Sequence, residues 1–428
     1  MNIIFVIIVL SAFFFAGWHQ IFFVPVNGGL SPMEILSKAM IQSATGAVEL
    51  AIGLVGVMAL FLGLMKVAEA GGLLTILARL IRPVMVRLFP DVPADHPAMG
   101  AMILNLAANM LGLGNAATPF GIRAMQELDT LNPQRGTATN AMALFLAINT
   151  SSITLLPTGV IALRASAGSS DPAAILPTTL LATVCSTTVA VVAAKLYQRV
   201  SPVRVDDGAV LQESSSIDGE KMPLKDAAQG YPLWVSLMAL AVLITLIPLA
   251  VCYGRSVSPW IIPALMVGFL GFGLVRGVRV YEVFVEGAKD GFQVAVRIIP
   301  YLVAILVAVD MLRASGVMDA VVGALGSVTG RLGLPAEALP MALMRPLSGS
   351  GAYGILASII NDPGIGPDSY TGYLVSTLQG STETTFYVLA VYFGAVQVRR
   401  IRHSLAAALT ADAAGVIFAV LACSFFLG

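Results

Sequence analysis

Some of the residues best suited to bind a solute lie in a polar stretch that follows an apolar run. The stretch, NLAANMLGLGNAATPFG, begins at Asn105 and places a second amide at Asn109, four residues on and therefore on the same helical face. Glycines then let the backbone turn, and we expect Asn115 and Thr118 to cap a short helix that begins near Pro119. The N-terminus of such a helix offers free N–H groups and the positive end of its dipole to an anionic or carbonyl-bearing solute.

A second stretch of the same kind lies in the other half of the chain. RPLSGSGAYG, at residues 345–354, holds Ser348 and Ser350 in a glycine-rich bend. Their hydroxyls are small hydrogen-bond donors that could contact a solute. Small residues also let helices pack closely, so a purely structural role for Ser348 is the alternative.

An intramembrane carboxylate gives the strongest indication of a binding site. LQGSTETTFY places Gln379 and Glu383 four residues apart on one helical face, with the hydroxyls of Ser381, Thr382 and Thr384 beside them. A carboxylate is costly inside a bilayer and marks a functional site by default. A buried structural ion pair, or a protonated acid that ties helices together, is the alternative.

The first half carries an uncharged counterpart, the sequence NTSS at residues 149–152. We expect Asn149, Thr150 and Ser152 to supply hydrogen-bonding groups to the same site. Pro157 follows closely, and because proline has no N–H it leaves a further carbonyl free.

Two further acids lie within apolar runs. Asp310 is close to the end of its run and can reach solvent, whereas Asp412 lies about a third of the way into the last run. Either residue could bind a coupling cation or carry a proton. Glu383 is the stronger candidate for that role.

Motifs for catalysis are missing from the sequence. It contains no HExxH, no P-loop and no dinucleotide-binding fingerprint, and its three cysteines stand singly in apolar runs. SGSG at residues 348–351 is similar to the GxSG motif of intramembrane proteases, but Ser348 stands where that motif has glycine. His403 lies in the basic sequence RRIRH, which suits solvent or lipid headgroups. We therefore expect no enzyme activity, no catalytic residue, no metal and no cofactor.

The composition is that of an integral membrane protein. Of 428 residues, 57% are hydrophobic and 11% are charged, against about 25% charged in a typical soluble domain. Basic and acidic residues are equal at 24 each, so net charge gives no reason to expect nucleic acid as a partner. The apolar N-terminus lacks a basic region and a cleavage site, which favours a retained first span over a signal peptide.

Apolar runs of about 20 residues can cross a bilayer. The long runs are Ile3–Val24, Ala47–Val67, Thr137–Leu163, Ala173–Ala194, Leu233–Tyr253, Tyr373–Val398 and Leu405–Leu427. Ile261–Val275 and Val294–Leu312 are shorter candidates. Met99–Leu113 and Leu339–Ile360 meet polar breaks, so we expect re-entrant hairpins or broken helices there. Leu73–Phe89 is amphipathic and typical of a surface helix.

The two halves of the chain repeat each other weakly. MKVAEAGG, with Gly71, matches MLRASGV, with Gly316, and RLFP, with Pro90, matches RLGLP, with Pro335. If the polar breaks are re-entrant and the central linker is cytoplasmic, most basic residues fall on the cytoplasmic side, as the positive-inside rule requires. The halves are then inverted relative to each other, as in many transporters.

These features predict an all-α polytopic membrane protein with two inverted-topology repeats and re-entrant or broken helices. The predicted parts are an N-terminal transmembrane helix at 1–30, a first repeat at 31–197, a polar cytoplasmic linker at 198–230, two connecting transmembrane helices at 231–280 and a second repeat at 281–428. The C-terminus is then periplasmic, and the membrane is the bacterial inner membrane.

The two motif-bearing stretches also carry a family resemblance. NLAANMLGLGNAATPFGIRAM resembles the signature of spore maturation protein A, and GSTETTFYVLAVYFGAVQVRRIRHSL resembles that of spore maturation protein B. Both belong to the nucleoside-recognition, or Gate, group, so the chain resembles a fusion of the two. The group is similar to the gate region of ferrous-iron transporters and, more distantly, to concentrative nucleoside transporters. The resemblance implies a polytopic helical fold with re-entrant hairpins and paired polar helices, and it does not supply a substrate.

The same resemblance indicates which positions to carry over as binding residues. They are Asn105, Asn109, Asn115, Thr118, Ser381, Thr382, Glu383 and Thr384. We expect the asparagines of the first half to face Gln379, Thr382 and Glu383 of the second half across a cavity.

The predicted function is transport of a small polar solute, nucleoside-like or another metabolite, with ion or proton coupling. The alternative is a non-transporting membrane module that binds a ligand and regulates an assembly. The expected partners are the solute, a coupling cation or proton and the lipid bilayer, with a homo-oligomer as a further alternative.

Overall fold

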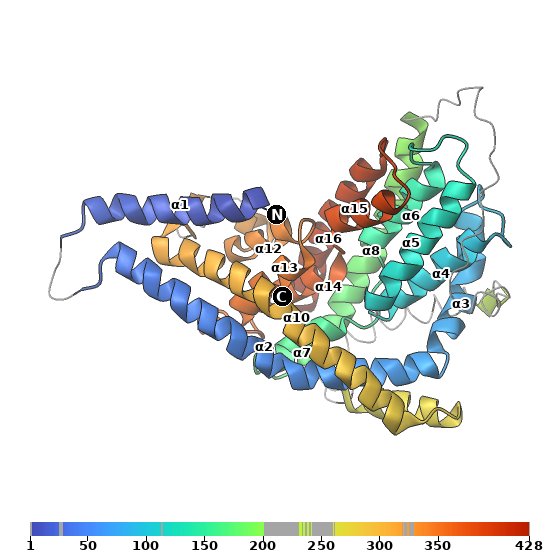
Figure 1. Cartoon of the computed structure of the whole chain (residues 1–428), viewed down its shortest axis with the longest axis horizontal. Coiled ribbons are helices and arrows are strands. Elements are labelled where there is room, and N and C mark those ends of the chain that lie inside the picture. The colour runs from blue at the N-terminus through green and yellow to red at the C-terminus, as the bar shows by residue number, and fades with distance from the viewer. Residues whose placement is uncertain are drawn as a thin grey trace.

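Helices make up the regular structure of the protein. The structure is a computed structural model that describes residues 2–24, 29–112, 114–200 and 262–427, except 319, 321–322 and 325–328, with isolated positions between 231 and 260. Within these residues every regular element is a helix (Figure 1). The predicted linker from residue 201 onward and most of the predicted span Leu233–Tyr253 lie outside the described residues.

Long apolar helices fit a protein that crosses the membrane several times. The longest described helices are α1 (Asn2–Ile21), α2 (Pro32–Ala70), α8 (Leu176–Val200), α10 (Val280–Ser315) and α16 (Ser404–Leu427). By length and composition, three stretches could each span a bilayer, namely Pro32–Ala70, Pro172–Val200 and Ser404–Phe426. A shorter apolar helix covers Ile262–Val275, close to the predicted one.

Helix α2 is much longer than the predicted span Ala47–Val67. Its start is fixed by a capping box, in which the Ser31 hydroxyl accepts from the N–H of Glu34 and the Glu34 carboxylate accepts from the N–H of Ser31. Pro32 occupies the first turn, where a missing N–H is tolerated. Hydropathy detects the apolar part of a helix, whereas the cap decides where the helix begins.

Helices α2 and α10 pack against each other in opposite directions and run as two long rods along the lower part of Figure 1. Towards one end a Cβ at Gly291 would lie 2.7 Å from the Ala59 backbone. Towards the other end the Ser43 hydroxyl donates to the Asp310 carboxylate. The glycine allows a close approach of the two backbones, as is typical of helix pairs in membranes.

Helices α8 and α16 are also antiparallel. Near the start of α8, Thr178 shares a hydrogen bond of 2.8 Å with Thr377, which accepts from the Cys423 thiol near the end of α16. Near the end of α8, Tyr197 bonds to Thr410 close to the start of α16 at 3.1 Å. An inverted repeat would also place corresponding helices antiparallel, but the repeat itself stays a prediction.

Two predicted spans are broken helices. Thr137–Leu163 divides into α6 (Asn140–Thr150) and α7 (Thr158–Ser166), and Tyr373–Val398 divides into α14 (Tyr370–Ser381) and α15 (Thr385–Ala395). The prediction that each run forms one continuous spanning helix was therefore wrong. Helix α6 already ends at Thr150, and Pro157 lies at the other end of the interruption as the N-cap residue of α7, where its missing N–H breaks no helical hydrogen bond.

The two broken helices pass between two hydrophobic cores in opposite order. Helix α6 packs through residues such as Phe145 in one core, whereas its continuation α7 packs through Ile161 in the other. Helix α14 packs through Leu374 in the second core, and α15 packs through Leu389 in the first. Each broken helix therefore starts in one core and ends in the other.

Helical hairpins precede both broken helices, as the polar breaks predict. The first consists of α4 (Pro97–Met110) and α5 (Gly114–Thr130), and the second of α12 (Leu339–Met344) and α13 (Gly349–Ile360). The expectation that Asn115 and Thr118 cap a helix beginning near Pro119 was wrong, because α5 already starts at Gly114 and contains that proline. An interior proline removes a single helical hydrogen bond, and α5 continues past it.

The remaining elements connect these pairs. Helix α3 (Leu73–Leu88) matches the predicted amphipathic helix and buries Leu74, Ala78 and Met85. Short 3-10 turns are η1 (Pro172–Ile175), η3 (Gly330–Leu332) and η4 (Ala336–Ala338).

A fully buried arginine ties the two halves together at one end of the bundle. The guanidinium of Arg164, on α7, donates to the carbonyl of Pro367 at 2.6 Å and to the Asp368 carboxylate at 3.0 Å, and its side chain is 0% exposed. Asp368 also accepts hydrogen bonds from Ser169 and Ser170. Partial burial raises the pKa of the Asp368 carboxyl, but these hydrogen bonds and the charge of Arg164 outweigh it and hold the pKa below its ordinary value of 3.8.

We predict that Asp368→Asn lowers the free energy of unfolding by about 2 kcal/mol at neutral pH, because Arg164 stays buried without its carboxylate. Since the folded pKa is depressed, the stabilisation from Asp368 is complete above the unfolded pKa and is lost as pH falls through the folded value. The difference between wild type and variant, measured by denaturant unfolding in micelles, should therefore shrink below about pH 4.

Asp95→Asn is the matched control, because the Asp95 carboxylate pairs with Arg82 while 99% exposed. An equal loss of stability in both variants, or a difference that does not change with pH, would contradict the assignment.

Candidate functional site

The two helix breaks meet backbone to backbone. The N–H of Glu383, in the break between α14 and α15, donates to the carbonyl of Thr150 at the end of α6, at 2.9 Å. One break follows Thr150 and the other follows Ser381, so equivalent points of the two halves are in contact.

Each break is also held by the tip of the hairpin in its own half. In the first half the N–H of Leu155 donates to the carbonyl of Met110 at 2.9 Å. In the second half the N–H of Phe386 donates to the carbonyl of Pro346 at 3.1 Å. Backbone groups released by the breaks therefore find partners inside the protein, as irregular backbone at membrane depth must.

The approach of the first hairpin to its break requires a glycine. Gly112 has a φ of 71°, and a Cβ there would lie 2.5 Å from the carbonyl oxygen of Leu156. A side chain at this position would be strained and would also separate the hairpin tip from the break.

Amide side chains form a largely buried network at the crossing, the place where the two helix breaks meet. The Asn109 amide donates to the Asn149 carbonyl oxygen at 2.9 Å, and the Asn149 amide donates to the carbonyl of Phe145 at 2.9 Å. The Asn105 amide donates to the hydroxyl of Tyr392, on α15, at 3.1 Å and to the carbonyl of Ala117 at 2.7 Å. This network joins α4, α5 and α6 of the first half to α15 of the second.

A charged pair also lies at the second break. Arg345, at the tip of the second hairpin, donates to the Gln379 carbonyl at 3.2 Å and to the Thr384 hydroxyl at 3.0 Å. Its guanidinium lies 3.6 Å from the Glu383 carboxylate. The arginine side chain is buried, whereas the glutamate side chain is 49% exposed.

The serines of the second hairpin lie at the start of α13. Ser348 caps this helix by accepting from the N–H of Gly351 at 3.0 Å, and its hydroxyl lies 3.5 Å from that of Ser350. A Cβ at Gly349 would lie 2.9 Å from the Thr384 hydroxyl, so the N-terminus of α13 packs directly on the break. Ser348 thus acts as the N-cap of α13 next to the charged pair, and its role in solute binding stays a prediction.

Most of the other predicted binding residues lie at the two breaks. Thr150, Ser152, Ser381 and Thr382 are buried, and the Thr150 and Ser381 hydroxyls donate to carbonyls of their own helices. The methyl of Thr382 packs where a Cβ at Gly415 would lie. Thr118 and the backbone of Asn115 lie in α5.

The structure thus brings the polar stretches of both halves together, but the residues pair with other partners than expected. Asn105 and Asn109 bond to Tyr392 and Asn149, while Gln379 and Glu383 contact Arg345. A role for any of these residues in binding stays a prediction.

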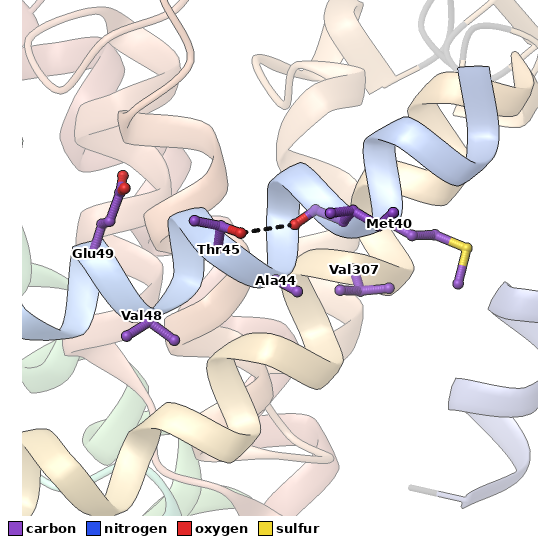
Figure 2. A pocket seen from close by; sticks show the side chains of 7 residues that line it. Met40, Ala44, Thr45, Val48, Glu49 and Val307 are labelled. Carbon is purple, nitrogen blue, oxygen red and sulfur yellow. Dashed lines mark hydrogen bonds between the residues drawn. The ribbon is translucent and has the colours of Figure 1, made fainter. Parts of the chain in front are cut away.

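The two aspartates lie in different places. Asp412 is buried in α16 beside the second break and accepts from the Thr385 hydroxyl at 2.7 Å. Asp310 lies on α10 and, with Arg313 and Asp362, lines a hollow between α2, α10 and the end of α13. A neighbouring apolar hollow between α2 and α10 is lined by Met40 of α2 and Val307 of α10, as Figure 2 shows. Break residues line neither of these two hollows.

Two residues central to this site were missed by the sequence analysis. Arg345 stands in the glycine- and proline-rich break of an apolar run, and a charged residue there was a usable signal. Tyr392 stands among aromatic and aliphatic residues of α15, where the sequence pattern resembles an ordinary apolar core. Nothing in its spacing distinguishes it.

We predict that Tyr392→Phe lowers the free energy of unfolding by about 1 kcal/mol, because the Asn105 amide then loses a buried acceptor. The ring keeps its stacking on Phe145, with centroids 6.0 Å apart. Tyr387→Phe on the same helix is the control, since Tyr387 is exposed and should change little. Denaturant unfolding in micelles measures both, and equal effects would contradict a specific role for the Tyr392 hydroxyl.

Comparisons with known proteins show relatives in both halves of the chain. The family model described as Gate, nucleoside recognition, matches residues 51–167 and 295–399. Spore maturation protein A of Bacillus subtilis (strain 168) is 48% identical over 164 residues, which are 38% of this chain and 82% of that protein. Spore maturation protein B of the same organism is 43% identical over 167 residues, which are 39% of this chain and 93% of that protein.

A solved structure is similar over nearly the whole length. The crystal structure of the Alcanivorax borkumensis YdaH transporter aligns with 99% of this chain and 97% of its own, at 17% identity and a TM-score of 0.37. The resemblance read from the two motif-bearing stretches is confirmed by the family match and by both spore maturation proteins. The chain therefore belongs to the Gate family of nucleoside-recognition proteins and is an all-α, multi-pass membrane protein.

Proposed function

We propose that the protein is a membrane transporter whose site for a small polar solute lies where the two helix breaks meet. The observation that carries this proposal is the contact of Glu383 N–H with the Thr150 carbonyl, because it joins the two halves at their least regular points. Breaks of this kind at the interface of two repeats are where many secondary transporters bind solutes. Rocking of one half against the other would open and close such a contact.

The charged pair gives the site its chemistry. A direct hydrogen bond between guanidinium and carboxylate is about 2.7 to 2.9 Å long, so the 3.6 Å between Arg345 and Glu383 is a loose contact. The exposed Glu383 carboxylate can accept from a solute N–H or O–H, while Arg345 and the N-terminus of α13 can donate to a carbonyl or hydroxyl oxygen. A solute with both donors and acceptors matches this combination.

Nucleosides are the first solutes to test. The family description names nucleoside recognition, and a nucleoside carries hydroxyls, ring acceptors and amide-like groups without a net charge. Such a molecule can bond to both members of the pair without leaving an unpaired charge in the site. Other polar metabolites of similar size would satisfy the same groups.

The membrane side of each end follows from the basic residues. We assign the protein to the bacterial inner membrane, with the linker after α8 in the cytoplasm and the C-terminus in the periplasm. The positive-inside rule supports this orientation. Ion or proton coupling would then use the intramembrane acids.

We predict that Glu383→Gln and Arg345→Gln each lower solute uptake by about tenfold or more. Losing one hydrogen bond to a charged group is worth about 1.5 to 3 kcal/mol, and 1.4 kcal/mol is a factor of ten. Uptake of labelled nucleosides, amino acids and dicarboxylates into proteoliposomes is the measurement. Glu69→Gln is the control, because Glu69 forms a surface pair with Lys66 on α2.

Full uptake by both variants would remove the pair from the mechanism. If wild-type protein transports no solute from broad metabolite mixtures but binds one of them in a thermal-shift assay, the protein is instead a non-transporting ligand-binding module.

A further inference from the structure

Asp412 is a buried acid with an incomplete set of partners. It lies in α16, is 5% exposed, and its Oδ2 accepts from the Thr385 hydroxyl at 2.7 Å. Its other oxygen, Oδ1, is buried and has no hydrogen-bond partner among the described residues. A carboxylate accepts up to about four hydrogen bonds, so this environment is poor for the ionised form.

Charged groups around Asp412 do not compensate it. The ion pairs among the described residues do not include Asp412. Arg345 is the charged residue whose field reaches Asp412, and it already contacts Gln379, Thr384 and Glu383.

The helices packed on α16 are α6, α8, α14 and α15. Helix α6 has no titratable side chain, and α14 and α15 have only tyrosines. The titratable residues on these helices are Cys185, Lys195, Tyr197, Arg199, Tyr370, Tyr373, Tyr387 and Tyr392. Lys195, in the last turns of α8, donates to the carbonyl of Leu88 at 3.1 Å, so it is engaged elsewhere. An ionised Asp412 would therefore have no ion-pair partner among the described residues, which is costly in a membrane interior.

A proton satisfies this site better than a metal ion. Hard cations take about six or more oxygen ligands, whereas the described neighbours give Asp412 one hydroxyl. The described residues also contain no group of three or more acidic, histidine or cysteine side chains suited to a metal. Protonation forms one O–H bond on the carboxylate and consumes one proton from the aqueous phase, with no other reactant.

The second break links this carboxyl to the solute site. Thr384 accepts from Arg345 at 3.0 Å, and the next residue, Thr385, donates to Asp412. Ionisation of Asp412 strengthens its hold on Thr385 and attracts Arg345, which weakens the Arg345–Glu383 contact and frees the exposed glutamate.

We propose that Asp412 is the proton-binding site of this protein and that Thr384 and Thr385 transmit its protonation state to the Arg345–Glu383 pair. The meaning of this link for transport rests on the proposed function. The proton site itself does not.

Infrared difference spectroscopy tests the proposal on the purified full-length protein, in micelles and without any solute. A protonated carboxyl has a carbonyl stretch that the ionised form lacks. We expect a band in wild type that disappears as pH rises, that is missing at every pH in Asp412→Asn, and that persists in Asp310→Asn. Asp412→Asn should fold normally, because the amide has the shape of the neutral acid.

Thr385→Val supplies a second variant in which Asp412 is intact. Removing a hydroxyl that donates to the ionised carboxylate should make the band persist to higher pH. Identical spectra for wild type and Asp412→Asn would overturn the proposal. A second contrary result would be a wild-type unfolding temperature that rises with Na⁺ but not with choline. If Asp412→Asn lacks this rise, the site binds a metal ion and the proposal is overturned.

The outcome is separable from that of the uptake experiment. A titrating Asp412 band in a protein that transports nothing would overturn the proposed transport and leave the proton site standing. Pronounced uptake with no Asp412 band would support transport and overturn the proton site.

Discussion

The need to satisfy every backbone N–H and C=O inside a membrane governs this structure. Both α6–α7 and α14–α15 give up part of their helical hydrogen-bond ladders, and the released groups must bond to protein. They do so in an equivalent way in the two halves, with Leu155 on Met110 and Phe386 on Pro346. The contact of Glu383 with Thr150 then joins one break to the other.

Because each broken helix starts in one hydrophobic core and ends in the other, the crossing is also the place where the cores are connected. A change in either break therefore shifts helices in both cores. An exposed glutamate, a buried arginine and two consecutive threonines connect this crossing to a carboxyl on α16. At the opposite side, the Arg164 and Asp368 pair holds α7 against the loop before α14.

Much of this arrangement could be read from the sequence, and the limit has a physical cause. Glycine, proline and amide residues inside apolar runs predicted both hairpins. The polar sequences NTSS and STET indicated where the two halves contact each other, because polar residues are costly in lipid and are sheltered by protein. Helical periodicity tells which residues share a face, but it does not tell which broken helices cross. The pairing of Asn109 with Asn149 and of Glu383 with Arg345 depends on that crossing and could not be predicted.

The most direct test of the account is cysteine cross-linking at the crossing. In a chain whose native cysteines are replaced by alanine, Thr150→Cys and Glu383→Cys are introduced together and oxidised mildly in native membranes. Residues joined by a backbone hydrogen bond lie close enough for a disulfide, which needs Cα atoms within about 7 Å. The account predicts a rapid intramolecular cross-link that each single variant lacks. Failure of the pair to cross-link, in protein that otherwise folds, would contradict the meeting of the two breaks.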